Sequence, residues 1–238
     1  MADNSDERDL VGFEPDELPG EACEGFIFRY FVPGEAGETL EVDASEGPHF
    51  SETEEKIFQR IRSVLVNRQD LLGLLGCLPN GLEIHLYQTT GRVGFRDHEN
   101  EIYFFGRTTN DGDSTIMEFA TDEVLHGGTG DHDVLDVVVH EMVHVLDFFN
   151  GYDEEGLLPG LSGIQRERFE AERLEEMKKI ITGQSPLDKY ALRDHAEFLA
   201  VLVETFFVKP VPLRHSNPVL YELLTEYFRL DPASTHIA

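Results

Sequence analysis

The stretch from Val137 to Gly151, VVVHEMVHVLDFFNG, constrains the fold more than any other part of the sequence. It is apolar nearly throughout, as a buried helix is, yet it carries two histidines, a glutamate and an aspartate. Burial of such groups is costly unless each one finds a partner. We therefore expect a fold that brings a shared partner to this helix inside the protein.

His140, Glu141 and His144 form the pattern H-E-x-x-H. Residues four apart lie on one face of a helix, so both imidazoles can point at one metal ion. Zinc suits imidazole nitrogen, and a water bound to zinc loses its proton near neutral pH. Glu141 lies about 100° round the helix and can reach that water as a general base. The alternative is that the two histidines pair with carboxylates elsewhere in the chain.

A catalytic zinc ion usually takes three protein ligands, so a third must be found. One known arrangement has a histidine six residues after the second histidine, but Asn150 occupies that position. Asp147 lies three residues beyond His144, although supporting a ligand or capping the helix end suits it better. Glu197 and Glu204 lie seven apart on one face of a later apolar helix. The residues alone leave these carboxylates open.

Periodicity predicts strands before this motif and helices after it. Strands are predicted at 25–34, 81–89, 101–108 and 114–120, a polar loop at 35–50, and helices at 51–76, 133–149, 163–183, 194–207 and 218–230. Capping boxes are predicted for Ser51 with Glu54 and for Ser162 with Gln165. The fold class is α+β, with a small mixed or antiparallel sheet and a helical C-terminal half that carries the metal site.

The large negative net charge limits the kinds of molecule that the protein is expected to bind. The 238 residues include 19 Lys and Arg against 47 Asp and Glu, a net charge of −28, which argues against nucleic acid and anionic membranes. Residues 1–24 are acidic, lack the apolar core of a secretory signal and are expected to be a disordered tail before one domain at 25–238. Two cysteines are too few for a disulfide framework, and no apolar run is long enough to span a membrane. We expect a cytoplasmic protein.

A family resemblance is carried by VVVHEMVHVLDFFNG, DKYALRDHAEFLAVLVETFFVKP and PVLYELLTEYFRLDP. Together they resemble the Mlc titration factor A family of zinc-dependent, gluzincin-like peptidases, most clearly over residues 114–232. In active-site design this family is similar to the anthrax lethal factor catalytic domain, which implies a zincin-like domain. The resemblance implies that Glu197 is the third zinc ligand, Glu141 the general base and Tyr190 the active-site tyrosine, with Glu204 supporting the ligands.

The resemblance implies hydrolysis of peptide bonds, with aminopeptidase action as one form of it. Tyr190 would donate to the oxygen that becomes negative when water attacks a carbonyl. The strand at 114–120 is expected at a sheet edge, where an extended peptide could pair with it. The alternative function is a regulatory protein that sequesters a transcriptional repressor or another partner through its zinc-supported fold, because members of this family also bind such a repressor.

Overall fold

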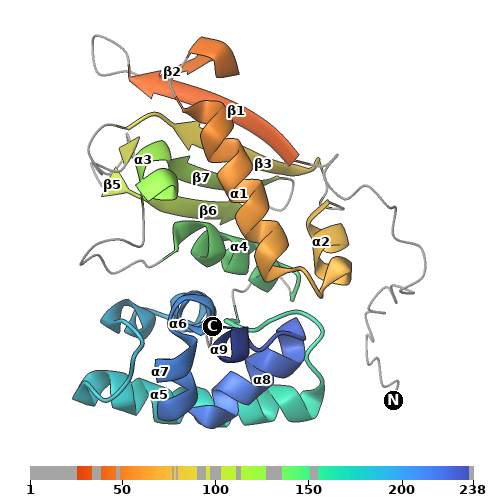
Figure 1. The fold of residues 1–238 in the computed structure, drawn as a ribbon, viewed down its shortest axis with the longest axis vertical. Helices are drawn as coiled ribbons and strands as arrows, with labels where there is room; N and C mark the ends of the chain where they lie inside the picture. The colour runs from red at the N-terminus through yellow and green to blue at the C-terminus, as the bar shows by residue number, and fades with distance from the viewer. Residues whose placement is uncertain are drawn as a thin grey trace, which may run out of the picture.

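A five-stranded mixed sheet forms one part of the molecule, and a group of helices forms the other (Figure 1). The structure is a computed structural model that describes residues 26–33, 39–46, 49–76, 78, 80–89, 95–96, 103–110, 114–126, 136–150 and 155–235. The predicted tail at 1–24 lies outside the described residues. The predicted α+β class is confirmed.

The sheet has the order β2-β1-β3-β7-β6. Its three inner strands, β1 (Phe26–Pro33), β3 (Leu82–Tyr87) and β7 (Thr115–Ala120), run parallel to one another. The edge strands β2 (Thr39–Val42) and β6 (Gly106–Asn110) each pair antiparallel with their neighbour. The sheet is therefore mixed, as the strand pattern predicts.

The expectation that β7 forms an edge of the sheet is wrong. β7 lies between β3 and β6, and all of its residues except Ile116 are buried. Apolar burial on both faces is typical of an interior strand, so the apolar run TIMEFA fits its observed place. The strand predicted at 101–108 is two strands, β5 (Tyr103–Phe104) and β6, and β5 pairs with β4 (Phe95–Arg96) in a separate small sheet. The edge beside the metal motif is therefore β6.

The helix predicted at 51–76 is two helices. α1 (Phe50–Val64) crosses the sheet in Figure 1, and α2 (Gln69–Gly76) follows a turn. Arg68 lies between the two helices, and its guanidinium donates to the Tyr227 carbonyl at 2.6 Å.

The capping box predicted at Ser51 is also wrong. α1 begins one residue earlier, after His49, which has a φ of 71° and makes no side-chain cap. The loop predicted at 35–50 contains β2 and the short η1 (Ala44–Glu46). Six-residue α3 (Thr121–His126) was not predicted, because so short a segment has no clear period.

The C-terminal helices follow the predicted pattern closely. They are α4 (Val137–Phe148), α5 (Gly163–Thr182), η2 (Lys189–Leu192), α6 (His195–Val208), α7 (Pro210–Ser216), α8 (Pro218–Phe228) and α9 (Pro232–Thr235). The capping box of Ser162 with Gln165 is confirmed, whereas α7 and α9 were not predicted. None of the described helices is both long and apolar enough to cross a membrane.

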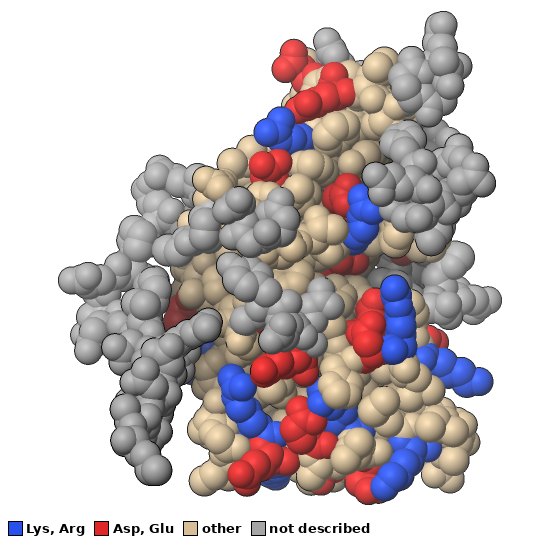
Figure 2. Space-filling view, turned by 180° about the vertical axis from the view of Figure 1, so that it is seen from behind, with Lys and Arg blue, Asp and Glu red and all other residues tan. Residues whose placement is uncertain are grey.

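Charged side chains spread over the surface of these helices. On the face in Figure 2, acidic and basic side chains lie interleaved over the helical part of the molecule. Short ion pairs join some of them, such as Lys178 with Glu175 at 2.6 Å and Arg168 with Glu222 at 2.7 Å. On this face the charge of the described residues is therefore mixed rather than gathered into one acidic patch.

The backbone at residues 156–157 contacts the end of α4 and the start of α6. The Asp147 carboxylate on α4 accepts the N–H groups of Gly156 at 2.9 Å and Leu157 at 3.0 Å. Gly156 has a φ of 67°, and a Cβ added to it would lie 2.2 Å from the His195 carbonyl oxygen. The loop backbone therefore touches the first turn of α6 at a point where only glycine fits.

Gly156→Ala should lower the free energy of unfolding by about 3 kcal/mol, because the methyl group adds a backbone clash to a left-handed φ. Gly183→Ala is the matched control: its φ is 71°, but nothing lies within 4 Å of an added Cβ. That control should lose only about 1 kcal/mol. Urea unfolding of both variants measures the difference, and equal losses would contradict a tight contact at His195.

Candidate metal centre

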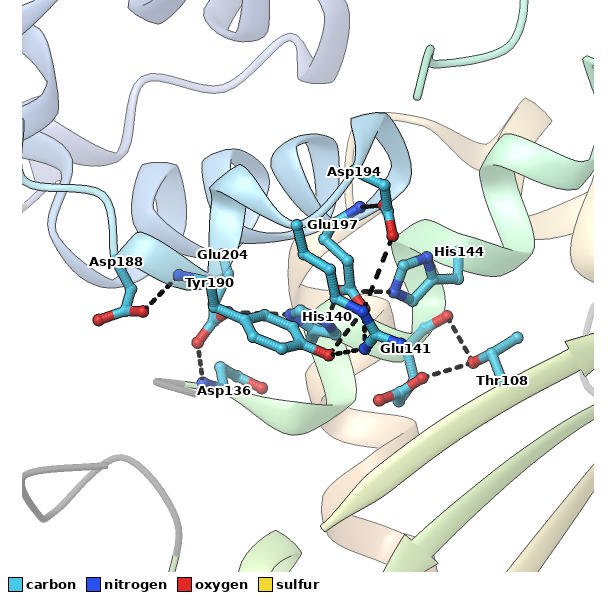
Figure 3. A network of polar contacts seen from close by, with 11 residues as sticks. Thr108, Asp136, His140, Glu141, His144, Asp188, Tyr190, Asp194, Glu197 and Glu204 are labelled. Carbon is cyan, nitrogen blue, oxygen red and sulfur yellow. Dashed lines mark hydrogen bonds and ion pairs between the residues drawn. The ribbon is translucent and has the colours of Figure 1, made fainter. Parts of the chain in front are cut away.

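The candidate metal centre lies where α4 and α6 pack side by side (Figure 3). Each helix starts at an aspartate cap. The Asp136 side chain accepts from the Val139 N–H at 3.2 Å, and the Asp194 side chain accepts from the Glu197 N–H at 2.8 Å. These caps satisfy backbone donors that would otherwise be orphaned in the first turn. They also fix where each helix begins, and so where its polar side chains point.

Two histidines from α4 converge on one carboxylate from α6. Glu197 Oε2 lies 3.0 Å from His140 Nε2 and 3.5 Å from His144 Nε2. One ligand atom from each of the three residues lies within 4.8 Å of the other two. The structure thus brings together the three residues that the resemblance implies as metal ligands.

The surroundings of His140 call for a positive charge between these atoms. Its Nδ1 faces Glu204 Oε2 at 3.2 Å, while its Nε2 faces Glu197. A neutral imidazole has one N–H only, so one of its nitrogens would present a lone pair to a carboxylate. Either a second proton or a metal ion removes that repulsion. Both readings left open by the sequence, a metal and a histidine paired with carboxylates, therefore meet at the same atoms.

The pKa values of His140 and Glu197 also indicate that a positive charge is favoured between them. Burial lowers the pKa of His140, but hydrogen bonds to Glu197 and Glu204 outweigh it and raise the pKa to about 10. Burial raises the pKa of Glu197, yet hydrogen bonds with His140 and His144 hold it well below its usual range. A proton on His140 thus takes the place where a cation would sit.

The spacing of the three residues fits a small divalent cation. A tetrahedral ion with bonds of about 2.0–2.1 Å holds its ligands about 3.3 Å apart. The two distances from Glu197 Oε2, 3.0 Å and 3.5 Å, lie on either side of that value. Two imidazole nitrogens and one carboxylate oxygen also form a donor set that zinc commonly takes. These two distances and the donor set are compatible with a bound ion, and all three ligand atoms lie within 4.8 Å of one another.

Glu204 orients His140 from the side away from the candidate ion. It is almost completely buried, and its Oε1 accepts the Asp136 backbone N–H at 2.6 Å. Its contact with Nδ1 directs Nε2 toward Glu197, the arrangement by which carboxylates support histidine ligands. Asp147, predicted to support a ligand or to cap the helix end, binds the loop backbone through both carboxylate oxygens.

Glu141 points toward the sheet and lies beneath β6. Thr108 Oγ1 on β6 donates to Glu141 Oε2 at 2.7 Å and lies 3.2 Å from its carbonyl oxygen. A Cβ on Gly106 would lie 2.7 Å from Glu141 Oε1 and 2.4 Å from Val137. The absence of a side chain at Gly106 therefore lets the edge strand approach Glu141 closely, and Thr108 fixes the carboxylate there.

Tyr190 closes another side of the centre. It lies on η2, and its hydroxyl donates to Glu197 Oε1 at 2.7 Å (Figure 3). Its ring centroid lies 6.1 Å from that of His140. Burial and the hydrogen bond to Glu197 raise the pKa of Tyr190 to about 12. The phenol therefore keeps its proton at neutral pH and remains a hydrogen-bond donor.

Four residues of the centre were not predicted from the sequence. Asp136 and Asp194 each directly precede an apolar helix, so the pattern of helix caps could have found them. Thr108 has no local signal, because it meets Glu141 only through the pairing of β6 with the sheet. Arg193 donates to the Tyr190 hydroxyl at 2.6 Å, a contact that depends on the turn between η2 and α6.

Comparison with known proteins gives a family and several relatives. The model of the family described as glucose-regulated metallo-peptidase M90 matches residues 83–229. Mlc titration factor A of Serratia proteamaculans is 33% identical over 102 residues, 40% of this chain and 39% of that protein. Mlc titration factor A of Yersinia enterocolitica is 29% identical over 102 residues, which are 40% of this chain and 38% of that protein. An uncharacterized Synechocystis protein is 29% identical over 105 residues, which are 40% of this chain and 36% of that protein. Each match thus spans less than 40% of the relative's length.

Glu204→Gln should weaken zinc binding about 10- to 100-fold without abolishing it, because Glu204 orients His140 and does not face the ion. Glu197→Ala should weaken binding further, since it removes a ligand atom. Competition with a chelator of known affinity measures both losses. Glu176→Gln is the control, a buried glutamate on α5 that binds Lys179 and Asn217. An equal loss of affinity in this control would contradict a specific role for Glu204.

Proposed function

This chain belongs to the glucose-regulated metallo-peptidase M90 family, and from that premise we propose that it is a zinc-dependent peptidase. His140, His144 and Glu197 would hold the zinc ion. One observation carries the proposal: two imidazole nitrogens meet at one carboxylate oxygen, with the Glu141 carboxylate on the same helix.

The metal would polarise the scissile carbonyl and make the attacking water more acidic. Glu141 takes a proton from that water as general base and later gives it to the leaving amine. Thr108 holds the Glu141 carboxylate in place for both transfers. Tyr190 turns its hydroxyl from Glu197 and donates a hydrogen bond to the carbonyl oxygen as that oxygen becomes negative.

The edge strand β6 is the proposed place for an extended substrate. Among the described strands, β6 pairs with β7 alone, and it passes directly over Glu141. A peptide added antiparallel or parallel to an edge strand gains main-chain hydrogen bonds. Such a peptide on β6 would bring its backbone carbonyls to Glu141 and the metal. Aminopeptidase action is a narrower form of this proposal, and a comparison of peptides with free and acetylated N-termini tests it.

A second candidate function is titration of a regulatory protein, and the name of the two Mlc titration factor A relatives favours it. A transcriptional repressor is the kind of partner proposed. In this role the chain would sequester its partner, and the metal centre would serve to hold the fold together. Binding measured with Glu141→Gln separates the two functions: titration keeps full strength in that variant, whereas hydrolysis is lost.

Glu141→Gln should lower peptide cleavage by about 10²- to 10⁴-fold, because the amide cannot accept the proton of the attacking water. Zinc content should stay at the wild-type level, since Glu141 is not a proposed ligand. Cleavage is measured with a fluorescent peptide library and zinc by atomic absorption. Thr108→Val keeps the Glu141 carboxylate as a proton acceptor and removes only the hydrogen bond that positions it, so it should lose less activity than Glu141→Gln. Unchanged cleavage by Glu141→Gln would rule out the assigned base.

A further inference from the structure

Arg193 brings a largely exposed guanidinium to the edge of the metal centre. It lies between η2 and the Asp194 cap of α6, and 60% of its side chain is exposed. Its Nη1 donates to the Tyr190 hydroxyl at 2.6 Å and to Glu197 Oε1 at 3.2 Å. The guanidinium therefore contacts one proposed ligand and the proposed oxyanion donor while much of it faces solvent.

Contacts within the chain use only part of this guanidinium. In the portion of the chain that the structure describes, both hydrogen bonds of Arg193 come from Nη1. Its Nε forms an ion pair with Asp194 Oδ2 at 3.9 Å, a separation too long for a hydrogen bond, so this carboxylate leaves the N–H donors of that edge unoccupied. A guanidinium carries five N–H donors in a planar fork that matches the two oxygens of a carboxylate. The edge formed by Nε and Nη2 is thus suited to an anion from outside.

The contacts of Arg193 should contribute little to the free energy of folding. Ion pairs of exposed side chains contribute little, and ordering a long arginine side chain costs conformational entropy. Glu197 and Tyr190 already hold each other, and His140 holds Glu197. Both side chains therefore have hydrogen-bond partners other than Arg193. A contact with a ligand explains better why a guanidinium is placed there.

We propose that Arg193 binds a carboxylate of the peptide substrate next to the bond to be cleaved, so that the site prefers acidic peptides. This inference rests on the proposed peptidase function. The carboxylate belongs either to an Asp or Glu side chain or to a free C-terminus, since both present the same pair of oxygens. The net charge of −28 repels acidic peptides from the protein as a whole. Arg193 supplies attraction at the one place where the substrate must sit.

Peptide binding by zinc-loaded Glu141→Gln tests this proposal without cleavage. Four pools of short peptides share randomised residues around one fixed position, which holds Glu or Gln, and end in a free carboxylate or an amide. A pool with Glu at the fixed position, a pool with a free C-terminus, or both should bind about tenfold more tightly than the pool with Gln and an amide end. Fluorescence anisotropy measures the dissociation constants. Adding Arg193→Gln should remove the difference, and Arg193→Glu should turn it into a preference for a Lys pool. The arm that shows the difference identifies the source of the carboxylate.

Arg168→Gln, added to Glu141→Gln, is the matched control. It removes the same charge from an exposed pair with Glu222, and it should keep the preference. Equal binding of all four pools by the parent, or a preference that survives Arg193→Gln, overturns the proposal. Cleavage of the pools by the wild-type protein is measured separately. Absence of cleavage together with an Arg193-dependent preference would refute the peptidase function and still support carboxylate binding.

Discussion

Two imidazoles from α4 meet one carboxylate oxygen from α6, and neither helix could bury its polar groups alone. α4 and α6 are apolar and buried over nearly their whole lengths, so each charged group on them needs a partner from another element. Glu204 on α6 contacts His140 on α4, and it also accepts a hydrogen bond from the backbone N–H of Asp136, the residue that caps α4. The packing of the two halves of the molecule is thus fixed by polar contacts at a few points and by apolar surface everywhere else.

Much of this centre could be read from the sequence because its residues lie on regular helices. The spacing of His140 and His144 places both on one face, and the capping pattern at Ser162 locates the start of α5. The residues alone could not choose among the later carboxylates, because the distance between α4 and Glu197 depends on the long connection between them. The family resemblance pointed to Glu197, and the geometry brings that residue to the two histidines.

The strands were harder to place than the helices. An alternating or apolar run predicts that a strand exists, but its position in the sheet is set by pairing with distant segments. β7 was expected at the edge because it lies just before the metal motif in sequence, yet β6 follows it in the sheet by antiparallel pairing. Thr108 owes its contact with Glu141 to this order. Neighbours in the chain were a poor guide to neighbours in space.

The hydrogen bonds around His140 have a consequence for how the protein would exchange its ion. With a proton between His140 and Glu197, the centre keeps its shape through contacts of its own. Small zinc domains unfold when chelators strip them, because the ion provides most of their folding energy. Here a large apolar core surrounds the site, so the chain should stay folded without an ion. A metal ion would then bind to ligands that already lie close together.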